Sequence, residues 1–188
     1  MVEERLISRD VALLRVDAGD LVNLLLPSYS SKDKAGANVI VCGLPASPGA
    51  STGKLAFSAE EATQRTQAGE DVLLVRRETS PEDVEGMHHA AGILTSTGGM
   101  TSHAAVVARG WGKCCVAGAG AVAIDEKKRR VTVGGKSYGP KDILSIDGST
   151  GEVMAGRVDG STPKMSGDFN TIMKWADAAR RLKVRTNA

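Results

Sequence analysis

The stretch Gly98-Gly99-Met100-Thr101-Ser102-His103-Ala104-Ala105-Val106-Val107-Ala108-Arg109 decides how the middle of the chain folds. It follows the apolar run Gly92-Ile93-Leu94, which predicts a strand that ends in a glycine turn. Either of the two hydroxyl residues before the histidine can cap a helix that runs to Arg109, and Gly110 is expected to end that helix. The pattern therefore places His103 in the first turn of a short helix, directly after a glycine-rich loop.

The predicted position of His103 favours phosphate chemistry. Free backbone N–H groups and the positive end of the helix dipole favour an anion at a helix N-terminus, typically by about 0.3–1 kcal/mol at exposed sites. The same field disfavours the imidazolium form, and a neutral imidazole can attack a phosphoryl group and hold it as a phosphoramidate. Gly98 and Gly99 let the backbone approach the phosphate, while Thr101 and Ser102 add hydroxyl donors. The alternative is a helix start at which a histidine happens to stand, and spacing alone does not separate the two.

The same residues resemble the phosphohistidine signature of the phosphoenolpyruvate-utilising enzymes. That signature is Gly-Gly-x-Thr-x-His followed by small residues, two aliphatic residues, a small residue and Arg, and residues 98–109 match it at every position. The wider run 93–116, with Trp111-Gly112-Lys113-Cys114-Cys115-Val116, resembles the pyruvate, phosphate dikinase branch of this family. The phosphoenolpyruvate synthase and sugar-transport Enzyme I branches resemble it less, because both usually have Arg where Met100 stands.

The resemblance implies a fold and an activity. The fold is a swivelling β/β/α phosphohistidine domain of the α/β class, which moves between two remote active sites. The activity is phosphoryl transfer, with His103 as catalytic nucleophile and carrier and with Gly98, Gly99, Thr101 and Ser102 cradling the phosphate. His103 would take the β-phosphoryl group of ATP, while inorganic phosphate accepts the γ-phosphoryl group, and would pass it reversibly to pyruvate to form phosphoenolpyruvate.

Further expectations come with the resemblance. Magnesium and the substrates would be held by other domains of a larger enzyme, expected to be a homodimer, with no metal or cofactor in this domain. Arg109 matches the signature as an auxiliary residue that either pairs with phosphate or contacts another domain. The threonine that matches Thr101 is phosphorylated in plant members to silence the enzyme, which makes Thr101 a candidate regulatory site. The alternatives are another phosphotransferase with the same carrier and a non-catalytic docking module.

The composition restricts the class of protein and its location. The chain has 188 residues and a formal net charge of +2, and this nearly balanced charge argues neither for nor against a polyanionic partner. Aromatic residues make up only 3%, which disfavours nucleic-acid binding by base stacking. No apolar run approaches the roughly 18 residues of a membrane helix and no signal-peptide pattern is present, so an intracellular location away from membranes is expected. Three cysteines, two of them adjacent, suit a reducing compartment, either the cytoplasm or an organelle such as a glycosome or plastid.

Three segments are predicted along the chain. Residues 1–37 are expected to be a helical linker from an upstream nucleotide-binding region, and residues 38–158 are the predicted swivelling domain. Residues 159–188 are expected to be a linker helix that leads into a truncated phosphoenolpyruvate- and pyruvate-binding barrel. The chain is therefore expected to be a central piece of a larger enzyme.

Within these segments the sequence predicts several short strands and few helices, a mixture typical of a layered α/β sandwich. Cys114 and Cys115 are neighbours in one expected strand, so their thiols should point to opposite faces as small buried apolar groups. The run 44–49 is expected to be a loop, because it contains two prolines. The expected strands are 39–43, 53–57, 71–76, 114–117, 131–135, 143–148, 151–155 and 184–188, and the expected helices are 2–16, 17–26, 58–68, 80–89, 102–109 and 168–183.

Three other motifs are not taken as functional. The run 49–54 looks like a nucleotide P-loop but has three residues between its glycines, and Leu55 stands where a hydroxyl residue is needed. His88 and His89 face different directions and have no acidic or cysteine partner at ligand spacing, so metal binding is not expected. The basic run 127–130 is interpreted as a solvated turn.

Overall fold

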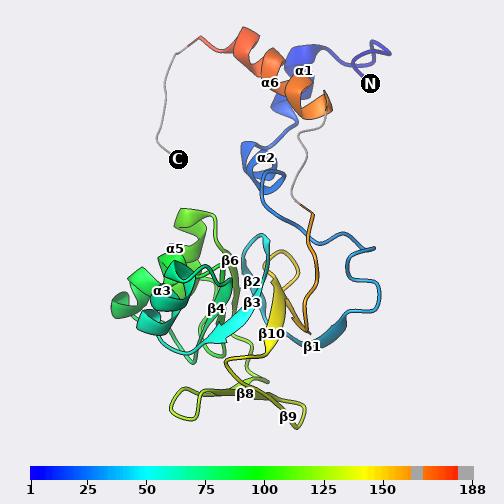
Figure 1. The fold of residues 1–188 in the computed structure, drawn as a ribbon. Helices are drawn as coiled ribbons and strands as arrows, with labels where there is room; N and C mark the ends of the chain where they lie inside the picture. Colours follow the sequence, from blue (N-terminus) through cyan, green and yellow to red (C-terminus); the bar gives the residue numbers. More distant parts are fainter. Residues whose placement is uncertain (162–166, 182–188) are drawn as a thin grey trace. The chain divides into compact units, whose positions relative to one another are not determined.

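The computed structural model describes residues 1–161 and 167–181, which divide into two compact units (Figure 1). Residues 26–161 belong to the larger unit, and residues 1–25 with 167–181 belong to the smaller one. None of the helices within the described residues is long and apolar enough to cross a membrane.

Three helices make up the smaller unit: α1 (Arg9–Leu14), α2 (Ala18–Asn23) and α6 (Gly167–Ala179). The hydroxyl of Ser8 caps α1, which packs against α6. The Arg9 guanidinium lies 5.7 Å from the centre of the Trp175 ring, within cation–π range.

The two N-terminal helices are shorter than predicted. The sequence suggested helices over 2–16 and 17–26, but Leu6 and Leu14 are exposed, and short helices without buried contacts gain too little to extend. The last residues of the helix predicted over 168–183, and the strand predicted over 184–188, lie outside the described residues.

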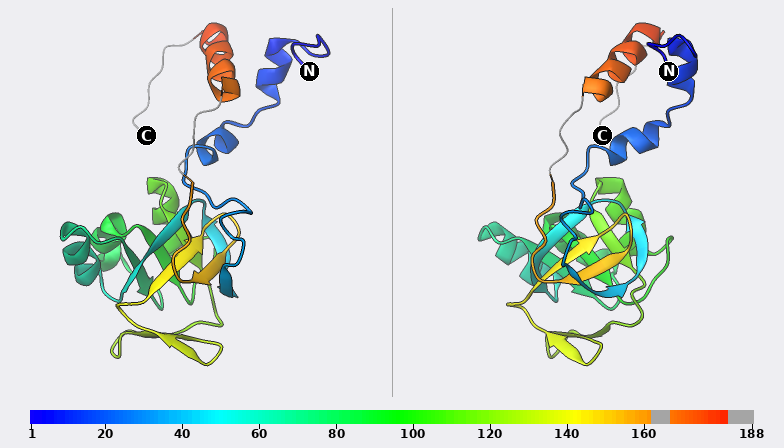
Figure 2. Two further views of the ribbon diagram at one scale, coloured as in Figure 1. Left: turned by 45° about the vertical axis from the view of Figure 1, so that its right-hand side comes forward. Right: turned by 90° about the vertical axis from the view of Figure 1, so that its right-hand side faces the viewer.

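An eight-stranded mixed sheet forms the larger unit, with the strand order β1-β11-β10-β3-β4-β5-β6-β2 (Figures 1 and 2). The four consecutive strands β3 to β6 are parallel, and the remaining pairs are antiparallel. The strands are β1 (Asn38–Cys42), β2 (Leu44–Ser47), β3 (Ala50–Ala56), β4 (Val72–Arg76), β5 (Gly92–Thr95), β6 (Cys114–Ala117), β10 (Ile143–Asp147) and β11 (Glu152–Ala155). A second, antiparallel sheet contains β7 (Ala123–Asp125), β8 (Arg130–Val133) and β9 (Lys136–Tyr138).

The two edges of the large sheet are joined by a single residue. β1 pairs with β11 at one edge and β2 pairs with β6 at the other, yet only Gly43 separates β1 from β2 in the chain. The sheet must therefore curl until its edges meet. At the meeting point the Gly43 N–H donates to the Gly151 carbonyl at 2.8 Å, and a Cβ on Gly43 would lie 2.8 Å from the Ala117 carbonyl oxygen.

The prediction of a loop over 44–49 is wrong for Leu44–Ser47, which form strand β2. The loop was predicted because Pro45 and Pro48 lack the backbone N–H group that a strand needs for pairing. β2 is an edge strand, and its register with β6 shifts between Pro45 and Ser47. Edge strands and irregular pairings are the places where a sheet accepts proline.

Both faces of the parallel strands are buried, which gives the larger unit two apolar cores. In β4, Val72 and Leu74 face a core shared with the helices, whereas Leu73 and Val75 face a second core. Residues of β10 and β11, including Ile146, belong to the second core, so the antiparallel half of the sheet covers the parallel half. The result is an α/β fold with helices, parallel strands and antiparallel strands in successive layers.

Cys114 and Cys115 point to opposite faces, as the sequence predicts: Cys115 belongs to the helix-side core and Cys114 to the core between the strands. Burial raises the pKa of the Cys115 thiol to about 12 and also raises the pKa of Cys114 well above its ordinary value. Both thiols are therefore protonated, unreactive packing groups.

Three α-helices, α3 (Ala59–Gln67), α4 (Val84–His89) and α5 (His103–Trp111), cover the helix-side core (Figure 1). The Ser58 hydroxyl caps α3 by accepting from the Glu61 N–H at 3.2 Å. A short 3₁₀ turn, η1 (Pro81–Asp83), leads into α4 through a capping box between Ser80 and Asp83. These starts agree with the predicted ones.

The end of α5 differs from the prediction. Gly110 was expected to stop the helix, but the helix continues to Trp111 and ends at Gly112, which has φ +63°. A C-terminal glycine acts by adopting the left-handed conformation, and Gly110 does not adopt it.

The segments by which the chain enters and leaves the larger unit lie side by side. Ser28 and Ser161 form an antiparallel bridge. The Tyr29 hydroxyl bonds to Thr52 Oγ1 at 2.8 Å, and Thr52 Oγ1 donates to the Val158 carbonyl at 2.9 Å. Residues 28–29 and 156–161, expected to be loop and linker, are thus held on the sheet.

We expect Gly86→Ala to destabilise the protein and Gly110→Ala not to. A Cβ on Gly86 in α4 would overlap the backbone of Ala59 in α3, whereas a Cβ on Gly110 in α5 meets nothing within 4 Å. Overpacking of this kind lowers the free energy of unfolding by about 1–3 kcal/mol, while alanine in an open helical position raises it by about 0.5–1 kcal/mol. Urea unfolding of the two variants measures the difference, and equal midpoints would contradict the close approach of α3 and α4.

Candidate functional site

The loop that precedes α5 begins at the carboxyl end of β5, where parallel strands commonly present functional groups. The Thr95 hydroxyl donates to the Thr97 carbonyl at 2.8 Å, which closes the first turn of the loop. Thr97 then donates twice to the carbonyl of Arg77, from its N–H at 3.0 Å and from its hydroxyl at 2.8 Å. The loop is therefore anchored to the segment that follows β4, the neighbouring parallel strand.

The two glycines of the loop differ in backbone conformation and in the space around them. Gly98 has φ +98°, and a Cβ there would lie 2.9 Å from the Cβ of Ser102, so its conformation and its surroundings both require glycine. Gly99 accepts the Ser102 N–H at 3.0 Å and has open space where a Cβ would project. The turn brings the loop back over the start of α5.

The N-terminus of α5 presents unused backbone donors. Ser102 is the N-cap, and its hydroxyl accepts from the Ala105 N–H at 3.4 Å. Within the described residues, no hydrogen bond engages the backbone N–H groups of Met100, Thr101, His103 or Ala104. Thr101 is exposed and Ser102 is half-buried. The result is a concentration of donors around His103, the arrangement that favours an anion.

Thr79 fixes the imidazole of His103. The buried Thr79 hydroxyl lies 3.1 Å from His103 Nδ1, and Nε2 has no hydrogen-bond partner within the described residues. When Nδ1 carries the proton and donates to Thr79, Nε2 keeps its lone pair and can act as a nucleophile. The contact therefore occupies Nδ1 and leaves Nε2 as the ring nitrogen without a partner among the described residues.

Arg109 braces the loop from within the same helix. Its Nε donates to the Ala105 carbonyl at 3.1 Å, and its Nη2 donates to the Met100 carbonyl. These bonds connect the last turn of α5 to the glycine-rich loop. Both contacts are with backbone oxygens inside the larger unit, so the described role of Arg109 is to position the loop.

An ion-pair network supports the Thr79 segment. The Arg76 guanidinium pairs with the buried carboxylate of Asp83 at 3.1 Å and with Glu126 at 3.3 Å. Asp83 also accepts the Ser80 N–H at 2.8 Å, which holds the residue after Thr79. The network links β4, η1 and the turn after β7, and thereby supports the segment that contains Thr79.

The donor set around His103 suits an anion and does not suit a metal ion. It consists of backbone N–H groups and hydroxyls, with no carboxylate in the loop. Among the described residues, no cluster of three or more His, Cys, Asp or Glu side chains could hold a metal. The ring of His88 lies 5.2 Å from that of Trp111 and 5.5 Å from that of His89, so this pair makes packing contacts.

One protein-family model matches the part of the chain that contains this loop. Residues 68–151 match the family model described as "PEP-utilising enzyme, mobile domain". The matched range contains Thr79, the glycine-rich loop and the whole of α5. This match makes residues 68–151 similar to the mobile domain of the phosphoenolpyruvate-utilising enzymes. The α/β fold, with its large mixed sheet and few helices, is consistent with that domain.

Relatives of this chain are similar to it over its full length. Pyruvate, phosphate dikinase from Rhizobium meliloti (strain 1021) is 50% identical over 188 residues, which is 100% of this chain and 21% of the relative. The enzyme of the same name from Clostridium symbiosum is also 50% identical over 188 residues, covering 22% of its length. Pyruvate, phosphate dikinase 2 from Zea mays is 50% identical over 188 residues, which cover 21% of its length. The chain spans about a fifth of these relatives.

The structure brings the predicted site residues together, because Gly98, Gly99, Thr101, Ser102 and His103 form one continuous loop and helix start. Sequence reasoning missed Thr79. Its position right after a buried strand was the available signal, since the carboxyl ends of neighbouring parallel strands meet at one sheet edge.

Removal of the Thr79 hydroxyl should release the imidazole of His103. We expect Thr79→Val to shift the neutral tautomer population of His103 about fivefold away from the form protonated at Nδ1, because one hydrogen bond contributes about 1 kcal/mol. Side-chain ¹⁵N chemical shifts measure the tautomers. Thr63→Val in α3, which removes only a hydroxyl bonded to the Ala59 carbonyl, is the matched control. Unchanged shifts in Thr79→Val would contradict the assigned contact.

Proposed function

We propose that this chain is the phosphoryl-carrier part of a pyruvate, phosphate dikinase, in which His103 takes the β-phosphoryl group of ATP and passes it to pyruvate. The full reaction is ATP, phosphate and pyruvate to AMP, diphosphate and phosphoenolpyruvate, and it runs in both directions. The observation that carries the proposal is the pairing of His103 Nδ1 with Thr79 at 3.1 Å, which leaves Nε2 available among unused N–H donors.

The proposed transfer consists of three displacements at phosphorus. The lone pair of His103 Nε2 attacks the β-phosphorus, the bond from that phosphorus to the oxygen shared with the α-phosphorus breaks, and AMP leaves with the electron pair. Inorganic phosphate then attacks the γ-phosphorus, the bond to the β–γ bridging oxygen breaks with its electron pair staying on the β-phosphoryl group, and diphosphate departs while the β-phosphoryl group remains on Nε2. The enolate oxygen of pyruvate then attacks the β-phosphorus, and the N–P bond breaks and returns its electron pair to Nε2. The Nδ1 proton remains on the Thr79 side throughout.

The surrounding residues have distinct proposed roles. The backbone N–H groups of Thr101 and His103 stabilise the equatorial oxygens of the transferred group, and Gly98 and Gly99 let these oxygens approach the loop. The Ser102 hydroxyl fixes the helix start by capping it. Arg109 keeps the loop in place and is a positioning residue.

The rest of the proposed enzyme lies outside the site described here. We propose that residues 1–37 connect to a nucleotide-binding region, that residues 38–158 are the moving carrier, and that residues 159–188 lead into a phosphoenolpyruvate- and pyruvate-binding barrel. Magnesium would be held by those other regions, in a homodimeric enzyme. The chain's coverage of about a fifth of its relatives supports this organisation.

His103→Asn in the full-length enzyme should abolish labelling by ³²P-phosphoenolpyruvate, because no other described side chain presents an imidazole at the donor-rich loop. The wild-type label should be lost in acid and kept in base, as a phosphoramidate requires. Since His103 is half-buried at a helix start, the free energy of unfolding should change by only about 0.5–1 kcal/mol. His88→Asn, at an exposed residue, is the matched control and should label normally. Label retained in His103→Asn would move the carrier role elsewhere, and absence of label in the wild type would favour a non-catalytic docking module.

Negative charge at Thr101 should block the transfer. The side chain is exposed and two residues before His103, so a charged group there competes for the same N–H donors. Two unit charges about 4 Å apart repel by roughly 4 kcal/mol at an effective dielectric of about 20, which is on the order of a thousandfold in rate. We expect Thr101→Glu to reduce turnover of the full-length enzyme far more than Thr101→Ser. Equal turnover of the two variants would show that Thr101 cannot serve as an electrostatic regulatory site.

A further inference from the structure

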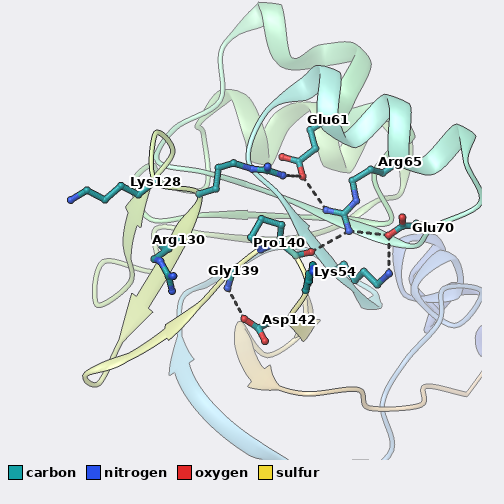
Figure 3. Close-up of a pocket in the computed structure, with 11 residues that line it drawn as sticks. Lys54, Glu61, Arg65, Glu70, Lys128, Arg130, Gly139, Pro140 and Asp142 are labelled. Carbon is teal, nitrogen blue, oxygen red and sulfur yellow. Dashed lines mark hydrogen bonds and ion pairs between the residues drawn. The ribbon is translucent and has the colours of Figure 1, made fainter.

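A groove lined by charged side chains lies between α3 and the two turns that precede β8 and follow β9 (Figure 3). Its volume is about 860 Å³, and its lining contains six lysine or arginine residues and three carboxylates. Neither the loop before α5 nor α5 itself contributes a lining residue. The groove is therefore separate from the site around His103.

The carboxylates of the groove are already occupied. Glu70 accepts from Lys54 Nζ at 3.0 Å and from Arg65 Nη2 at 2.9 Å, and these partners hold the pKa of Glu70 below its ordinary value. Glu61 accepts from Arg65 Nη1 at 3.0 Å and from Arg129. Asp142 accepts the Gly139 N–H at 2.6 Å. Glu61 and Glu70 are thus both paired with cations, whereas Asp142 contacts only a backbone N–H group.

Arg65 makes the floor of the groove rigid. Besides its two carboxylate partners, it donates to the Leu55 carbonyl at 2.8 Å and to the Pro140 carbonyl at 3.2 Å. It thereby connects α3, β3 and the turn after β9, and only 18% of its side chain is exposed. These contacts hold the floor in place before any ligand arrives, which reduces the entropy lost on binding.

The rim of the groove carries unpaired cations. Arg130 and Lys141 are exposed and have no hydrogen-bond or ion-pair partner within the described residues. Lys128 contacts only Asp125, at 3.6 Å, and 80% of its side chain is exposed. In Figure 3, Lys128 and Arg130 lie on the turn and strand opposite Arg65, and Lys141 and Arg129 also line the groove. The rim of the groove thus presents exposed lysine and arginine donors, which lack carboxylate partners within the groove, above a floor that is held by Arg65.

We propose that this groove binds an acidic segment of a partner protein outside this chain. Nucleic-acid interfaces are much more uniformly positive than this mixed lining, and no aromatic side chain is present to stack on a base. A single phosphate would occupy only a small part of a volume of about 860 Å³. A row of peptide carboxylates offers acceptors to Arg130, Lys141 and Lys128, which all line the groove. Because the groove is separate from the His103 loop, binding there does not require the carrier site to be empty.

The test uses the 188-residue chain and fluorescein-labelled hexaglutamate, with binding followed by anisotropy at about 50 mM salt. The groove variant combines Arg130→Glu with Lys141→Glu. The matched control combines Lys127→Glu with Lys136→Glu, which changes the net charge equally at exposed positions that do not line the groove. We expect affinity to fall at least about tenfold in the groove variant and to change less than about threefold in the control.

The outcomes separate the alternatives. Equal losses in the two variants, or no binding by the wild type, would overturn the proposal in favour of general surface charge. Displacement of hexaglutamate by tripolyphosphate, or by a single-stranded oligonucleotide of the same charge, at lower concentration than by unlabelled peptide would overturn it in favour of a small anion or a nucleic acid. Loss of peptide binding in the groove variant alone, with higher salt weakening the wild-type complex, would support it.

Discussion

The closure of the large sheet at Gly43 is the constraint on which the rest of the structure depends. Consecutive strands β1 and β2 pair at opposite edges, so the sheet has to curl until those edges meet. A side chain at Gly43 would collide with the Ala117 carbonyl, which lies only 2.8 Å from the position of a Cβ. Because the sheet closes on itself, its antiparallel half covers the parallel strands, and both faces of these strands are removed from water.

This burial explains why so few side chains are needed to hold the glycine-rich loop before α5. The carboxyl ends of β4 and β5 are fixed by two apolar cores, and the segments that leave them are joined through the Arg77 carbonyl. Thr79 and His103 therefore meet although they are 24 residues apart. A phosphoryl carrier needs one nucleophilic nitrogen with a constant orientation and donors that do not reorganise. Both features here come from backbone geometry, supported by one hydroxyl and one arginine.

The proposed His103 site and the proposed groove differ in the source of their positive potential. Around His103 the positive potential comes from unused backbone N–H groups, with little formal charge in the loop. In the groove beside α3 it comes from lysine and arginine side chains, three of which remain after the carboxylates are paired. Backbone donors act over the first turn of a helix, whereas side-chain charges act over a Debye length of about 10 Å at 0.1 M salt. The first design suits close contact with a small group and the second suits capture of a larger partner.

The sequence alone determined the features that depend on neighbouring residues. The helix starts at residues 58, 80 and 102 were predicted, with the cap of the last left open between Thr101 and Ser102, and the alternation of Cys114 and Cys115 placed their thiols on opposite faces. Caps and strand periodicity are local properties. The family signature over residues 98–109 identified His103 and its loop for the same reason.

Only the tertiary structure decided the features that join distant segments. Leu44–Ser47 became a strand because β6 lies beside it, α5 continued past Gly110 because that residue is not in the left-handed conformation, and the basic turn at 127–130 became one wall of a groove. Thr79 acquired its contact with His103 because two parallel strands end at the same edge. The hydrophobic periodicity of the sequence does not predict such pairings, because each arises from contacts between residues far apart in the chain.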